Sequence, residues 1–137
     1  CVEPETICKV PKKINSEAAA CLFQSGTTAY QVFTHMAKIE EGDRFLVHGG
    51  SGAVGNILLQ LCQLNGVEAV STASAEKLDR LRQWTNQVFD YRSPTYFSDL
   101  KQVAGEGFDA AIDFSNQKSI NNSFNLLKDG GSLKLLG

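Results

Sequence analysis

Strand-like and helix-like segments alternate along this 137-residue chain. Between the strand-like runs, apolar residues recur at helical spacing, as Val54, Ile57, Leu58 and Leu61 do after the first run. Strands that are separated by helices of this length pair in parallel through right-handed crossovers. The pattern predicts an α/β fold with a doubly wound parallel sheet in three α/β/α layers. The expected core strands are 44–48, 67–73, 87–91, 108–114 and 132–137.

Capping signals indicate where two of the helices begin and end. Ser74 directly follows the second expected strand, where a serine suits the N-cap of a helix. The last helix is expected to carry Ile120, Phe124 and Leu127 on one face. It is expected to stop at Asp129-Gly130-Gly131, before the last strand.

Charge and composition narrow the class of partner. The chain has 13 Lys and Arg residues against 15 Asp and Glu residues, a net charge of −2, and no basic run. This balance argues against a nucleic-acid surface and favours a small-molecule partner. The longest uncharged apolar stretch, 54–64, is too short and too polar to cross a bilayer, so no membrane partner is expected.

The cysteines indicate a reducing compartment. Cys1, Cys8, Cys21 and Cys62 form no C-x-x-C pair, and the two histidines lie far apart, so no metal-ligand spacing is present. A disulfide framework is typical of smaller secreted domains. We therefore predict no metal site, reduced buried thiols and a cytoplasmic location.

A glycine-rich stretch, GGSGAVG, joins the first expected strand to the first expected helix. Gly50, Gly52 and Gly55 form the G-x-G-x-x-G pattern of dinucleotide-binding folds, in the structural context that this pattern requires. Gly50 would permit the tight turn, Gly52 would let a pyrophosphate approach the backbone, and Gly55 would let the helix pack against the strand. The helix N-terminus would offer N–H groups to the phosphates. The alternative is a glycine loop that serves only a flexible turn.

Two other glycine motifs do not fit. A P-loop would need Lys and then Ser or Thr where Asn56 and Ile57 stand. The short-chain reductase pattern would need a glycine at Ala53. The glycine stretch therefore favours a dinucleotide over a nucleoside triphosphate.

The end of the second expected strand bears on the choice of cofactor. An Asp or Glu about twenty residues after the glycines would hold the adenosine ribose of NAD. The chain has none there, and Thr72, Ser74 and Lys77 offer hydroxyl groups and a cation instead. These residues favour a 2′-phosphate and therefore NADP (NADPH), while NAD stays open.

Several stretches together resemble one family. AACLFQSGTTAYQVF, GDRFLVHGGSGAVG, FDYR and GFDAAIDF…LLKDGGSLKLLG are similar to the medium-chain dehydrogenase/reductase superfamily, above all to its zinc-independent quinone oxidoreductase (zeta-crystallin-like) branch. The resemblance implies that residues 1–14 are a residual strand and linker from a GroES-like catalytic domain. Residues 15–137 would then be an NAD(P)-binding Rossmann domain, incomplete at its C-terminus, from a longer parent that is a homodimer.

The resemblance also assigns roles to residues. Zinc-dependent members have a ligand cysteine four residues before the matched threonine, and Gln24 stands there in this chain, which implies no metal. The residues expected to bind the cofactor are Thr28 at the nicotinamide, Gly50, Gly52, Ala53, Val54 and Gly55 at the pyrophosphate, Thr72, Ser74, Lys77 and Tyr91 at the 2′-phosphate, and Phe114, Ser115, Asn116 and Gly137 at the nicotinamide ribose.

Two classes of function are compatible with these features. In the first, the parent is an NADPH-dependent reductase that transfers hydride to quinones or other conjugated carbonyls (enones), and this chain, inactive alone, binds the cofactor. An enoyl-thioester reductase is an alternative within this class. In the second, the domain is a non-catalytic NADPH-binding scaffold or sensor. No catalytic residue is assigned, and His48 is interpreted as a packed imidazole rather than a base.

Overall fold

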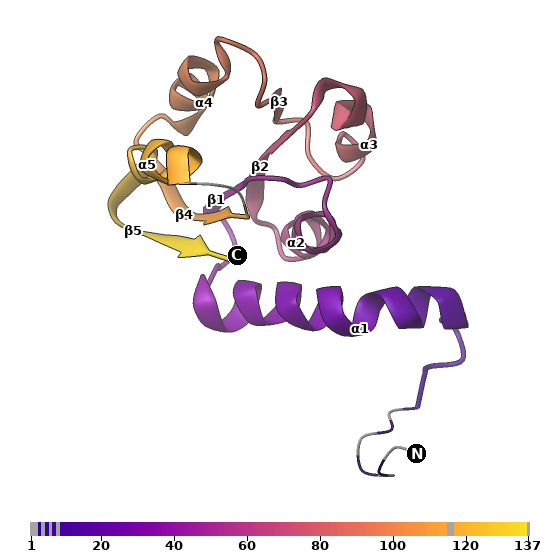
Figure 1. Ribbon diagram of the computed structural model, residues 1–137. Helices are drawn as coiled ribbons and strands as arrows, with labels where there is room; N and C mark the ends of the chain where they lie inside the picture. Colours follow the sequence, from indigo (N-terminus) through magenta and orange to yellow (C-terminus); the bar gives the residue numbers. More distant parts are fainter. Residues whose placement is uncertain (1–2, 4, 6, 8, 115–116, 137) are drawn as a thin grey trace.

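The computed structural model describes residues 3, 5, 7, 9–114 and 117–136. In this part of the chain, five parallel strands form one sheet in the order β3-β2-β1-β4-β5. Helices lie on both faces of the sheet (Figure 1), which confirms the expected doubly wound α/β fold. The strands are β1 (Arg44–Val47), β2 (Glu68–Ala73), β3 (Val88–Asp90), β4 (Phe108–Asp113) and β5 (Leu127–Leu135).

The longest helix precedes the sheet. α1 (Ser16–Gln31) begins where the side chain of Asn15 accepts a hydrogen bond from the N–H of Ala18 at 2.8 Å, and it continues into the π-helical turn η2 (Val32–Met36). α1 packs along α2 (Figure 1). No helix in the described ranges is long and apolar enough to span a bilayer. The other helices are α2 (Ala53–Leu64), η3 (Ala75–Lys77), α3 (Leu78–Leu81), α4 (Tyr96–Ala104) and α5 (Gln117–Phe124).

The sheet separates two apolar clusters, because successive side chains of a strand point to opposite faces. Phe45 and Val47 of β1 pack with Leu58 of α2 on one face. Leu46, between them, packs with Leu100 of α4 on the other face. All five side chains are fully buried. Burial on both faces explains why the central strands are continuous apolar runs rather than alternating ones.

The C-terminal part of the chain departs from the expected boundaries. α5 ends at Phe124, and Leu127 begins β5 instead of extending the helix. Leu127 pairs with Phe108 at the start of β4, so sheet pairing overrides the helical spacing of the apolar residues. Asp129-Gly130-Gly131 does not stop a helix. It forms a bulge inside β5, with a φ of 81° at Gly130.

Candidate functional site

The glycine loop lies at the carboxyl end of the central strand. β1 has β2 on one side and β4 on the other, so the direction of chain progression reverses at β1. After β1, residues 48–52 turn into α2. Ligands of open α/β sheets bind at such a switch point, just outside the carboxyl ends of the strands.

Three glycines of the loop are required by the fold itself. The turn has its positive φ, 69°, at Gly49 and not at Gly50, which corrects the assignment of the tight turn. Gly50 is buried, and a Cβ atom there would overlap the hydroxyl group of Ser71. A Cβ atom at Gly55 would lie 2.5 Å from the carbonyl oxygen of Gly49, so only glycine lets α2 approach the loop this closely.

Gly52 has a weaker internal requirement. Its φ of −75° and ψ of 169° are open to any residue, and a Cβ atom there would meet only the carbonyl oxygen of Gly49, at 3.3 Å. Gly52 is exposed at the start of α2, where the first N–H groups have no acceptor within the helix. The missing side chain therefore leaves space for a ligand, and the helix N-terminus favours an anionic one.

A crevice of about 230 Å³ lies over this helix end. Phe114, the residue after β4, forms its far wall, and its expected place at the nicotinamide ribose stays a prediction. Backbone donors and a narrow, glycine-lined floor suit a pyrophosphate. Ser115, Asn116 and Gly137, also expected at the cofactor, lie outside the described residues. The lining residues are Gly49, Gly52, Ala53, Val54, Gly55 and Phe114.

A larger pocket of about 460 Å³ opens on the α1 side of the same loop. Gly52 lines both the crevice and this pocket, which also receives Arg80 of α3. Sequence reasoning missed Arg80. The signal was present, because Arg80 follows Lys77 by three residues, the spacing that brings side chains to one helix face.

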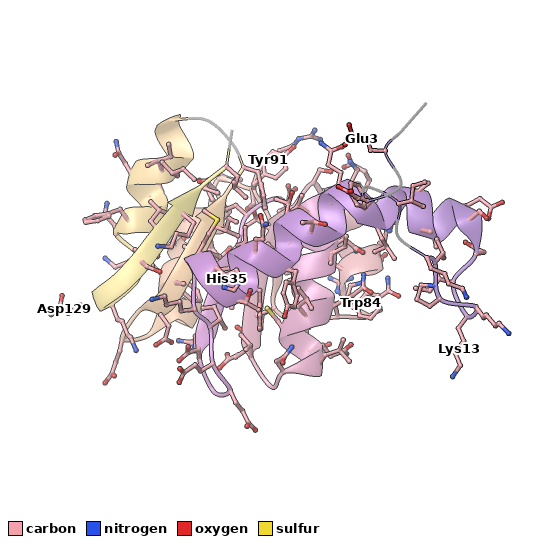
Figure 2. All side chains as sticks on the ribbon, turned by 90° about the horizontal axis from the view of Figure 1, so that it is seen from below. Glu3, Lys13, His35, Trp84, Tyr91 and Asp129 are labelled. Carbon is pink, nitrogen blue, oxygen red and sulfur yellow. The ribbon has the colours of Figure 1, made fainter. Side chains whose placement is uncertain are left out.

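The residues expected at a 2′-phosphate surround η3 and the end of β3. Lys77 and Tyr91 are exposed, and Figure 2 shows Tyr91 at the rim of the molecule. The guanidinium of Arg92 lies 5.4 Å from the ring centroid of Tyr91 and 3.8 Å from the carboxylate of Glu76. Ser74 is the N-cap residue of η3, as predicted, but it is buried and its side chain makes no capping bond, so its expected role at the 2′-phosphate stays a prediction. The pKa of Glu76 lies below its ordinary value, mainly because a backbone N–H group donates a hydrogen bond to its carboxylate. The hydroxyl group of Ser74 donates a second, weaker one.

Two threonines use their hydroxyl groups inside the protein. Thr72 is 2% exposed, and its Oγ1 lies 3.1 Å from Nδ1 of His48. This burial turns the Thr72 side chain away from any ligand, which corrects its expected role at the 2′-phosphate. Thr28 is half-buried on α1 and donates to the carbonyl of Gln24 at 2.9 Å. Its position beside a nicotinamide stays a prediction.

The described residues contain no group of three His, Cys, Asp or Glu side chains that could hold a metal ion. Of the cysteines in the described ranges, Cys62 is buried, and burial raises the pKa of its thiol to about 12. Cys21 is exposed, so the expectation of a buried thiol was wrong for this residue. Cys21 lines the larger pocket beside the glycine loop, because α1 packs on α2.

The strand order and the glycine loop at the switch point define a doubly wound domain of the Rossmann type. The sequence model of the zinc-binding dehydrogenase family matches residues 53–137. The chain belongs to this family, which confirms the resemblance to the medium-chain dehydrogenases and reductases.

Individual relatives agree with this assignment. The quinone oxidoreductase of Pongo abelii is 30% identical over 135 residues, which are 96% of this chain and 41% of that protein. The CurK enoyl reductase superposes with a TM-score of 0.88 and 30% identity, over 95% of this chain and 40% of its own. A mycobacterial protein in complex with NADPH gives a TM-score of 0.85 and 31% identity, over 94% and 40%.

The chain therefore spans about two fifths of the length of these relatives. The described residues before α1 add no strand to the sheet. The assignment of residues 1–14 to a separate catalytic domain, and of 15–137 to the cofactor domain, stays a prediction.

A metal analysis tests the zinc-free branch within a family whose description includes zinc. We expect that the purified chain, after dialysis against buffer without metal, contains far less than one zinc per chain. The reason is that Gln24 stands at the expected ligand position and that a zinc site needs several thiolate, imidazole or carboxylate ligands. Elemental analysis by mass spectrometry provides the measurement. About one zinc per chain, the stoichiometry of an ordinary site, would contradict the prediction.

Proposed function

We propose that this chain is the NADPH-binding part of an oxidoreductase that transfers hydride to quinones or other conjugated carbonyls. The observation that carries the proposal is the crevice of about 230 Å³, whose floor at Gly52 is free of side chains although the backbone conformation there is open to any residue. The N-terminus of α2 adds N–H donors and a positive dipole end. Such a crevice fits the pyrophosphate of a dinucleotide, and the NADPH complex of the mycobacterial relative supports the choice.

The chain's own residues would bind and orient the cofactor. NADPH supplies a hydride ion to an electrophilic carbon when it is bound. The glycine loop would hold the pyrophosphate, and Phe114 would close the crevice on the β4 side. Orientation of this kind converts an encounter between two molecules into a step within one complex, which lowers the barrier by several kcal/mol, of the order of 7–11 in the best cases.

Charge around η3 and α3 favours NADPH over NADH. Lys77 and Arg80 are exposed, Arg80 lines the pocket beside the glycine loop, and Arg92 lies near Tyr91. The acidic residues of η3 and α3 are each paired with an arginine, Glu76 with Arg92 at 3.8 Å and Asp79 with Arg82. A 2′-phosphate would therefore meet a surplus of positive charge.

Cofactor titration tests this preference. We expect the chain to bind NADPH more tightly than NADH, and Lys77→Ala to reduce the difference. A hydrogen bond to a charged group contributes about 1.5–3 kcal/mol. Because Lys77 is exposed, we expect the lower end of this range, about a tenfold loss of NADPH affinity with NADH affinity unchanged. Fluorescence or calorimetric titration of both cofactors provides the dissociation constants.

Arg82→Ala is the matched control. Arg82 is an exposed cation just past α3, but its guanidinium is paired with Asp79. Loss of this cation changes the net charge as Lys77→Ala does and is expected to leave the preference intact. Equal affinity of the unsubstituted chain for NADPH and NADH would refute the NADP assignment.

The substrate class is part of the same proposal. The quinone oxidoreductase of Pongo abelii supports a quinone, and the CurK enoyl reductase supports a conjugated thioester as the second candidate. Turnover of a quinone panel and of enoyl thioesters by the longer protein separates the two. Cofactor binding without turnover of either would indicate the scaffold or sensor role. The cytoplasmic location and the homodimeric parent belong to this proposal too, and rest on the family resemblance.

A further inference from the structure

Four buried polar side chains form a chain of hydrogen bonds beneath the crevice. They come from the loop after β1, from β2, from β4 and from α5, and each is at most 6% exposed. Oγ1 of Thr72 lies 3.1 Å from Nδ1 of His48, and Nε2 of His48 lies 2.9 Å from Oγ of Ser123. The hydroxyl of Ser123 donates to Oδ2 of Asp113 at 3.2 Å.

The direction of these bonds follows from the carboxylate. An ionised carboxylate only accepts, so the single hydroxyl proton of Ser123 points to Asp113. Ser123 must then accept from His48, which places the imidazole proton on Nε2 and leaves Nδ1 bare. Burial lowers the pKa of His48 more than the charge of Asp113 raises it, so the ring is neutral at pH 7.

The same logic extends to the glycine loop. A bare Nδ1 accepts the hydroxyl proton of Thr72, and Oγ1 of Thr72 then keeps its lone pairs for a donor. The N–H of Gly49 lies 3.4 Å away and fills that place. Donation thus runs in one direction, from the backbone of Gly49 through Thr72, His48 and Ser123 to Asp113.

The chain of bonds ends next to both walls of the crevice. Gly49 forms one wall, and Asp113 directly precedes Phe114, which forms the other. The two walls lie close together, since a Cβ atom added at Gly49 would lie 3.8 Å from Cδ2 of Phe114. A change in any of the linked side chains would therefore change the relative position of Gly49 and Phe114.

We propose that His48 is a positioning residue for the cofactor, which holds the two walls of the crevice in register through this one-directional chain of hydrogen bonds. This inference rests on the proposed NADPH-binding function. His48 and Ser123 do not form a nucleophile and its base, because Ser123 is fully buried and its proton points to Asp113 rather than to the imidazole. The Ser123 hydroxyl therefore joins the walls and takes no part in bond making.

Ser123→Ala tests the inference through cofactor affinity. It removes the link between His48 and Asp113 without adding volume, and we expect the dissociation constant of NADPH to rise about tenfold, as a small displacement of binding groups does. The matched control is Ser71→Ala. Ser71 is also fully buried and packs below Gly50, but its hydroxyl donates to the carbonyl of Val47, at 2.8 Å, and lies outside the chain of bonds that joins Gly49 to Asp113. Ser71→Ala is expected to change the NADPH dissociation constant less than threefold, and both variants are checked for folding by thermal melting.

The tautomer of His48 tests the direction of the hydrogen bonds separately from any change in stability. The chain has two histidines, and His35, labelled in Figure 2, is exposed, so a His35→Gln background leaves one imidazole signal. In ¹⁵N spectra of this background we expect a protonated Nε2 and a bare Nδ1. Adding Ser123→Ala is expected to shift the Nε2 resonance.

The outcomes are separable. Unchanged NADPH affinity in a folded Ser123→Ala variant, or a proton on Nδ1 in the spectra, would overturn the positioning role alone. Equal losses in Ser123→Ala and Ser71→Ala would also overturn it, because the effect would then belong to any buried hydroxyl. Absence of NADPH binding by the unsubstituted chain would overturn the proposed function.

Discussion

Replacing Gly52 with valine is expected to weaken NADPH binding at least tenfold while the chain stays folded. The backbone of Gly52 is in a conformation that any residue adopts, and its exposed side meets no protein atom closer than 3.3 Å. The branched side chain would instead fill the floor of the crevice, where the pyrophosphate is proposed to lie. A tenfold loss corresponds to about 1.4 kcal/mol.

The melting temperature and the NADPH dissociation constant are measured on the same preparation. Gly52→Ala serves as the graded control, since one methyl group occupies less of the crevice and is expected to cost less affinity. A folded Gly52→Val variant with unchanged affinity would mean that the glycine stretch serves only the turn. That result would also remove the main support for the proposed function.

Gly55→Ala is expected to have the opposite signature, a loss of stability as the primary effect. The new Cβ atom would lie 2.5 Å from the carbonyl oxygen of Gly49 and 2.8 Å from Cα of Gly50, and both are backbone atoms without a rotamer to change. Overpacking of this kind costs about 1–3 kcal/mol. The gain in helix propensity, about 1 kcal/mol at most, offsets only part of this cost.

Gly26→Ala is the matched control, because Gly26 is also a helical glycine. A Cβ atom there would make only ordinary contacts with Leu22, the nearest at 3.6 Å. The substitution is expected to raise the free energy of unfolding by up to about 1 kcal/mol. Urea unfolding of both variants measures the difference, and a Gly55→Ala variant as stable as Gly26→Ala would show that α2 is not held against the loop.

The sequence predicted those features of the fold that depend on local pattern. The alternation of elements yielded the sheet and its two faces, and the glycine stretch located the crevice at the switch point. The beginning of β5 escaped prediction, because Leu127 continues the helical spacing and only its pairing with Phe108 makes it a strand residue. Pairing partners that are far apart in the chain leave no local signal.

The details of the candidate site were less predictable for the same reason. The sequence predicted a cofactor contact at Thr72, but its hydroxyl group lies inside the protein, against the imidazole of His48. Arg80 lines the pocket beside the glycine loop only because α3 packs near α2. Helical spacing indicates the face of Arg80 but not which element lies opposite that face.

The residues that join the two crevice walls are far apart in the sequence, and this bears on how the protein folds. His48 and Ser123 are 75 residues apart, so the bonds that join the walls form only after β1 and β4 have paired and α5 has closed over them. Contacts between such distant residues carry a loop-closure cost that is incurred before they contribute stability. The crevice is therefore a marker of the fully assembled sheet, and a ligand bound there shifts the folding equilibrium toward that state.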